Sequence, residues 1–115
     1  MKTLIIIITL LMSVPCIAQN YNVEKDKYIN SVLCQKPNKV LKIDYTNAIY
    51  YELWYDEIKI EWHLYHQVPF EQQVSECFLV HDKSGNIIII DGLVNKHRIS
   101  PNTLIRIKTI CLNIK

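Results

Sequence analysis

The chain has 115 residues, and its 13 Lys and Arg nearly balance its 11 Asp and Glu, which gives a formal charge of +2 at pH 7. This length suits a single domain. The sequence has no cluster of basic residues, which argues against nucleic-acid binding, because proteins of that class group their cations to neutralise phosphates.

The N-terminus predicts a secretory signal peptide. Lys2 precedes an apolar run, Leu4–Met12, which is too short to span a bilayer as a stable helix, and Pro15 breaks any helix that continues from it. We expect cleavage after Ala18 and a periplasmic or secreted protein with no stable transmembrane segment after cleavage. Cys16 resembles the acceptor of a lipoprotein, but Pro15 stands directly before it, so we expect no lipidation.

Removing residues 1–18 leaves 97 residues, which we expect to fold as one domain over residues 19–115. This part of the chain contains three cysteines, Cys34, Cys77 and Cys111, and an odd number permits at most one disulfide within the chain. Cys77 and Cys111 fall in segments that we predict to be strands, so they are the candidate pair. Buried free thiols are the alternative, because Cys is among the most buried residue types.

The first predicted elements after the signal are a helix and a strand. Between Tyr21 and Gln35 apolar residues recur at intervals of three and four, which is the pattern of an amphipathic helix, and Pro37 closes the segment. Lys39–Tyr45 then alternates between apolar and polar residues, as a strand with one buried face does.

The segment Ala48–Gln67 is rich in Tyr, Trp and Ile, and it predicts two antiparallel strands. The alternation changes phase at Asp56 and Glu57, as expected for a turn between strands. A helix in the first half of this segment is the alternative. The following segment, Phe70–Glu76, predicts one or two helical turns.

The C-terminal part predicts a hairpin, a helix and a last strand. The strand Cys77–His81 is joined by a turn with Gly85 to Ile87–Ile90, whose uninterrupted apolar residues indicate a central strand covered on both faces. Ser100 and Pro101 have the types preferred for an N-cap and a first helical residue. A final strand is indicated by period-two alternation of Ile110, Leu112 and Ile114. These elements predict an α+β domain with a small mixed or antiparallel sheet of about five strands, an N-terminal amphipathic helix and a short helix before the last strand.

One stretch of the C-terminal part matches a family pattern. An apolar strand ending in Asp91-Gly92 is followed by Ile99–Ile107, which reads Ile-Ser-Pro-Asn-Thr-Leu-Ile-Arg-Ile. This order, over Ile87–Cys111, resembles a segment of the plug domain of TonB-dependent outer-membrane receptors of the SusC-like kind. Two positions differ from the acidic residues of that family: Thr103 and Ile105. The resemblance implies a small plug-like α/β piece in a Bacteroidetes-type cell envelope, and it does not carry transport with it.

Histidines and cysteines offer two arrangements for chemistry, and for each we favour a simpler interpretation. His63 and His66 lie three residues apart, which places them on opposite faces of a strand and argues against a shared metal. His81 with Cys77 or Cys34 would make a base and a thiol nucleophile, but neither cysteine stands in a local sequence typical of catalysis.

The acidic residues Asp56, Glu57 and Glu61 are a third arrangement, because paired carboxylates serve in acid–base catalysis. Alternation along a strand predicts instead a row of charges that faces water. We therefore expect no catalytic residue, no metal site and no cofactor.

The feature of the sequence least expected from folding alone is a group of aromatic residues: Tyr50, Tyr51, Trp54, Tyr55, Trp62 and Tyr65. In a strand, Tyr50 and Trp54 share a face with Glu52 and Asp56, away from the core residues. Large amphipathic rings on a polar face are typical of binding surfaces, so we predict Tyr50 and Trp54 as binding residues and Trp54 as the anchor. A core with tyrosine hydroxyls at its edge is the alternative.

The sequence thus predicts an exported, non-enzymatic binding protein with a protein partner in the cell envelope. Two alternatives remain. The first is a periplasmic immunity protein or a protein resembling a protease inhibitor, and the second is a small secreted enzyme with no recognisable motif.

Overall fold

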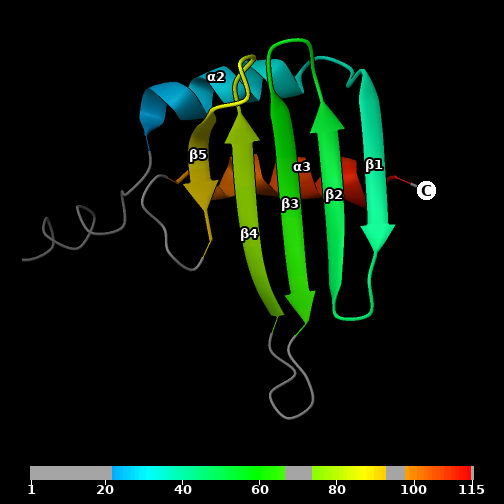
Figure 1. The fold of residues 1–115 in the computed structure, drawn as a ribbon. Helices are drawn as coiled ribbons and strands as arrows, with labels where there is room; N and C mark the ends of the chain where they lie inside the picture. Colours follow the sequence, from blue (N-terminus) through cyan, green and yellow to red (C-terminus); the bar gives the residue numbers. More distant parts are fainter. Residues whose placement is uncertain (1–21, 67–73, 93–97, 115) are drawn as a thin grey trace, which may run out of the picture.

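A computed structural model describes residues 22–66, 74–92 and 98–114, which form one five-stranded sheet and two helices. The elements in chain order are α2 (Val23–Leu33), β1 (Lys39–Asp44), β2 (Ala48–Trp54), β3 (Lys59–His66), β4 (Val74–His81), β5 (Ile87–Asp91) and α3 (Pro101–Leu112). Each strand pairs antiparallel with its neighbour in sequence, so the sheet order is β1-β2-β3-β4-β5 (Figure 1). The predicted α+β class and the sheet of about five strands are confirmed.

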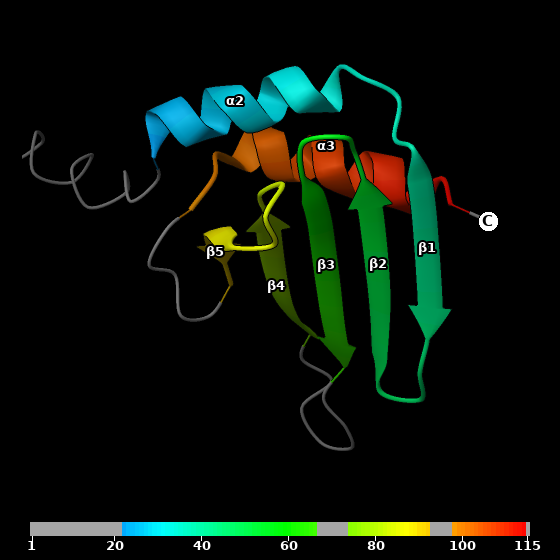
Figure 2. The same ribbon diagram turned by 45° about the horizontal axis from the view of Figure 1, so that its top comes forward.

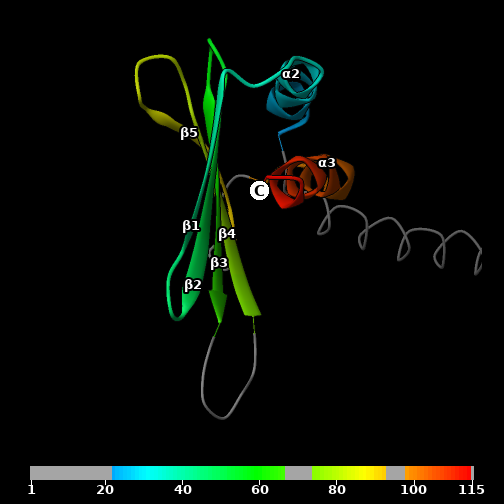
Figure 3. The same ribbon diagram turned by 90° about the vertical axis from the view of Figure 1, so that its right-hand side faces the viewer.

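Both helices lie on the same side of the sheet (Figure 3) and run across its strands (Figure 2). Cross-strand pairs show which side chains face the helices, because directly opposite residues point to the same face. Leu53 pairs with Ile60 on the helix side, whereas Glu52 pairs with Glu61 on the other side. In the described part of the chain no helix covers that second side, which we call the open face.

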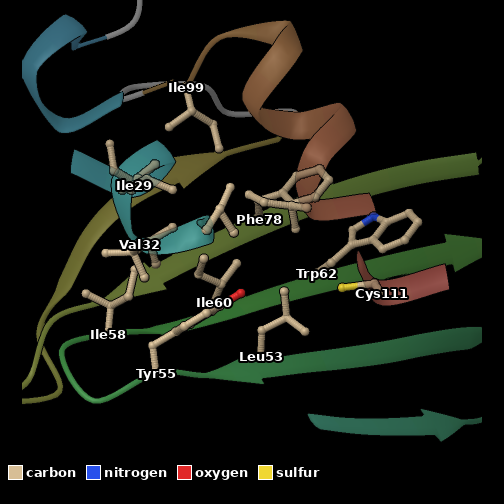
Figure 4. Packing of buried hydrophobic residues seen from close by; sticks show 14 of the residues in the cluster. Ile29, Val32, Leu53, Tyr55, Ile58, Ile60, Trp62, Phe78, Ile99 and Cys111 are labelled. Carbon is tan, nitrogen blue, oxygen red and sulfur yellow. The ribbon is translucent and has the colours of Figure 1, made fainter. Parts of the chain in front are cut away.

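The core lies between the sheet and the two helices (Figure 4). Helix α2 contributes Ile29 and Val32, and α3 contributes Ile107 and Cys111. The sheet contributes alternate residues of β2 to β5, including Leu53, Ile60, Trp62, Phe78, Val80 and Ile89. This periodicity of three and four in the helices and two in the strands is what allows both kinds of element to bury one apolar face.

A buried carboxylate joins the two helices. Oδ1 of Asp26 in α2 accepts hydrogen bonds from the Ser100 backbone N–H at 2.7 Å and from Thr103 Oγ1 at 2.9 Å. Asn30, one turn further along α2, also donates to Thr103 Oγ1 at 2.5 Å. Ser100 is the N-cap of α3 and Pro101 is in its first turn, as the sequence predicts.

The predicted hairpin of β4 and β5 is present, with a turn that Asp82 organises. Its Oδ1 accepts the backbone N–H groups of Ser84 and Asn86, both at 2.9 Å. Gly85 has a φ of 89°, which only glycine adopts without strain. A β-bulge interrupts the pairing next to this turn, where His81 pairs with Ile87 but Val80 pairs with Ile89.

The prediction of a central strand over Ile87–Ile90 is wrong. Strand β5 is at the edge of the sheet, and its side chains alternate in burial, with Ile89 0% exposed and Ile87 51% exposed. A run of β-branched residues fits a strand covered on both faces or one covered on a single face. The absence of a described layer over the open face decides between them here.

The prediction of a final strand is also wrong, because α3 continues through Ile110 to Leu112. Thr103, Ile107 and Cys111 are buried at a spacing of four, which is the helical period. The predicted helical turns over Phe70–Glu76 are wrong for the last three residues, which belong to β4, and residues 70–73 lie outside the described residues.

The predicted signal peptide, residues 1–18, lies outside the described residues as well. Neither described helix has the length and apolar composition needed to cross a membrane.

Candidate binding face

Two carboxylates stand opposite each other on the open face. Glu52 of β2 pairs with Glu61 of β3, so both side chains point away from the helices. They are 8% and 6% exposed although no described helix covers them, because neighbouring side chains on the same face surround them. Like charges directly opposite each other are unfavourable, so each carboxylate needs strong partners.

Glu52 has two neutral donors. The Tyr50 hydroxyl donates to Oε2, and Trp54 Nε1 donates to Oε1 at 2.6 Å. Both donors come from positions two residues away in the same strand, which places all three side chains on one face. Burial, together with the hydrogen bond to Glu52, raises the pKa of Tyr50 above its usual range, so this hydroxyl remains a donor at any physiological pH.

Glu61 has three basic neighbours. Lys59 Nζ lies 3.1 Å from Oε2, and His63 Nε2 lies 2.8 Å from Oε1. His81 Nε2 approaches Oε2 at 2.6 Å, but out of line for a hydrogen bond. Burial alone would raise the pKa of Glu61, but the hydrogen bonds from His63 and Lys59 outweigh it and lower that pKa. Glu61 is therefore ionised at neutral pH and does not hold a proton that it could donate in catalysis.

Trp54 is half-buried between two lysines. Lys59 Nζ lies 4.9 Å and Lys39 Nζ lies 5.6 Å from the centre of its ring, so both ammonium groups make cation–π contacts. The structure thus places Tyr50 and Trp54 on one face with Glu52, as the sequence predicts. Asp56, predicted on the same face, is instead an exposed residue of the turn between β2 and β3.

An aromatic groove opens on the same face, beyond Tyr50 and His63. It has a volume of about 380 Å³ and is lined by Tyr45, Ala48, Ile49, Tyr50, His63 and Tyr65. The rings of Tyr50 and His63 have centres 4.5 Å apart, and those of His63 and Tyr65 are 6.1 Å apart. A smaller hollow of about 170 Å³ lies at the opposite end of β2 and β3 and includes Trp54 and Lys59.

The expected row of charges facing water is wrong for Glu61, which is buried, whereas Asp56 and Glu57 are exposed. Once the turn at Asp56-Glu57 is placed, the sequence predicts that Glu61 lies opposite Glu52, because both are equally far from that turn. The sequence does not predict the contact of Glu61 with His81, because that contact depends on how β4 is aligned with β3.

The cysteines are free thiols in the described structure. Cys111 lies in α3 rather than in a strand, and Cys77 pairs with His63 on the open face, so the sheet separates the candidate disulfide pair. Burial and the charges of Asp91 and Glu61 raise the pKa of Cys77, which disfavours the reactive thiolate.

Among the described residues no group of three His, Cys, Asp or Glu side chains is placed to hold a metal ion. His63 contacts Glu61, and His66 is exposed at the end of β3.

Comparisons with protein-family models, with curated proteins and with solved structures gave no match. The resemblance to a plug domain therefore stays a prediction.

Proposed function

We propose that this chain is an exported, non-enzymatic protein that binds a protein partner through the open face of its sheet, with Trp54 as the anchor. The observation that supports this proposal is the aromatic and carboxylate cluster on the face that no described helix covers. Its side chains bond to one another rather than to the core.

Such a cluster suits binding because its side chains are already ordered. Immobilising a flexible side chain at an interface costs roughly 0.5–1.5 kcal/mol, and groups that are fixed beforehand avoid most of that cost. Tyr50 and Trp54 are fixed by Glu52, and Trp54 also lies between two lysines. Tyr and Trp are among the residue types that dominate binding energy at interfaces.

The same contacts argue against catalysis. A general acid needs a carboxyl group that keeps its proton, and the lowered pKa of Glu61 excludes Glu61 from that role. Cys77 has His63 as its cross-strand neighbour, yet Nε2 of His63 contacts Glu61 and the raised pKa of Cys77 keeps it a thiol. If the partner is an enzyme, binding through this face would make the protein an inhibitor or an immunity protein.

Trp54→Ala should abolish partner binding while it lowers stability only moderately. Loss of an interface anchor costs about 2 kcal/mol or more, which is roughly a 30-fold weaker Kd, whereas loss of the hydrogen bond from Trp54 to Glu52 costs about 1.5 kcal/mol of folding stability. The measurement is crosslinked pull-down from envelope extract together with a thermal melt. Tyr28→Ala, on the outer side of α2, is the matched control and should retain the partner. A partner that Trp54→Ala and Tyr28→Ala retain equally would contradict the proposal.

Export should remove residues 1–18, because the charged start, the short apolar run and Ala18 form a signal-peptide pattern. Intact-mass measurement of the protein from the envelope fraction checks this, and we expect the mass of residues 19–115. A mass that includes Met1, or one that carries acyl chains on Cys16, would show an anchored protein instead.

A further inference from the structure

The aromatic groove lies next to negative charge. Along β3 the open-face side chains follow in the order Lys59, Glu61, His63 and Tyr65, and the opposite positions in β2 are Trp54, Glu52, Tyr50 and Ala48. The two carboxylates therefore lie one row behind the rings of the groove, at a strand spacing of about 7 Å. Lys39 and Lys59, the two lysines beside Trp54, lie on the far side of the carboxylates from the groove.

The walls of the groove are electron-rich. Its described lining consists of three tyrosines, one histidine, Ala48 and Ile49, and contains no Lys, Arg, Asp or Glu. The face of an aromatic ring carries negative charge density, and Tyr50 gains more because its hydroxyl donates to the Glu52 carboxylate. His63 likewise contacts the Glu61 carboxylate. A cation is the ligand type that complements such walls.

We propose that this groove binds the guanidinium group of an arginine side chain from the partner, an inference that rests on the proposed function. Guanidinium is planar, weakly hydrated and stacks on aromatic faces, so it fits between rings better than a compact, strongly hydrated ammonium does. The rings of His63 and Tyr65 are inclined by only 23° to each other, so two nearly parallel rings line the groove. Tyr65, 43% exposed, forms its accessible wall.

The test uses the full-length protein and NMR titration of its tyrosine ring signals. The probe is N-acetyl-arginine methylamide, and the control is the citrulline analogue, which has the same shape without the charge. We expect the arginine probe to shift the signals of Tyr50 and Tyr65 and to bind at least ten times more tightly than the citrulline analogue. Equal binding of the two would overturn the inference, and so would tighter binding of tetramethylammonium, because that result identifies a site for small free cations.

Variants locate the site. Tyr65→Leu should weaken arginine binding at least tenfold. Tyr45→Leu, which removes a ring from the other wall of the groove, should also weaken it. Glu52→Gln should weaken it several-fold, because it removes a negative charge near the groove. Tyr28→Leu, whose ring is 41% exposed on α2, should leave the affinity unchanged. If Tyr65→Leu and Tyr45→Leu melt like the wild type and bind arginine equally well, the groove is not the site.

The two proposals fail separately. If Trp54→Ala loses the partner while arginine and citrulline bind alike, the binding face stands and the guanidinium site falls. If arginine binds in the groove while Trp54→Ala retains the partner, the groove stands and the proposed anchor falls.

Discussion

Replacing Ile89 with Asp should abolish cooperative folding. Ile89 is 0% exposed and belongs to the core between β5 and the helices, where a carboxylate would have no partner. Burying an unpaired charge costs several kcal/mol, a large part of the roughly 5–15 kcal/mol that stabilises a domain. Far-UV circular dichroism during thermal unfolding should show no sharp transition for this variant.

Ile87→Asp is the matched control, because it makes the same change two residues earlier in the same strand. Ile87 is 51% exposed, so the variant should stay within about 0.5 kcal/mol of the wild type. If both variants fail to fold, β5 is covered on both faces and the strand is central after all. If both fold normally, β5 does not pack as described.

The sequence predicts the strands well where polar residues mark the alternation. Lys42 and Asp44 in β1 and Lys59, Glu61 and His63 in β3 mark one face of each strand with polar side chains, and Glu52 marks one face of β2. Ile87–Ile90 has no polar residue to mark a face. Its place at the edge depends on which strands pair, and a local pattern does not contain that information.

The two ends of α3 show the same contrast. Its start was predictable because Ser100 and Pro101 have defined roles at a helix N-terminus. Its end was not, because the apolar residues at 110, 112 and 114 alternate by coincidence while Ile107 and Cys111 continue the buried helical stripe. Tertiary packing of that stripe against the sheet outweighs a short period-two signal.

The candidate site divides in a similar way. Tyr50 and Trp54 lie with Glu52 on the face expected from strand alternation. The burial of Glu61 was missed because it depends on His81, which comes from a different hairpin. The groove was missed as well, since it combines residues of the β1–β2 connection with the far end of β3.

The Cys111 thiol should make the folded state sensitive to alkaline pH. Burial raises its pKa from 9.0 to about 12, so above pH 9 the unfolded chain loses a proton that the folded chain keeps. A raised folded-state pKa gives stability that is present below pH 9 and is lost as the pH rises toward 12. This loss has a slope of about 1.4 kcal/mol per pH unit and amounts to roughly 4 kcal/mol over the window.

The unfolding free energy of Cys111→Ala should therefore fall less steeply between pH 9 and 12 than that of the wild type, and the difference in slope should correspond to nearly one proton. Urea unfolding at a series of pH values measures both slopes. The lost side-chain volume lowers its stability at every pH, so the slope rather than the absolute value carries the result. Burial also raises the pKa of Tyr55 to about 12, so Tyr55 contributes to the fall of unfolding free energy in both proteins. Cys34→Ala removes an exposed thiol instead and is the control for the loss of a cysteine. An unchanged slope in Cys111→Ala, together with fewer than three thiols titrated in the denatured wild-type chain of residues 19–115, would mean that Cys111 is oxidised, which requires an arrangement of α3 different from the one described.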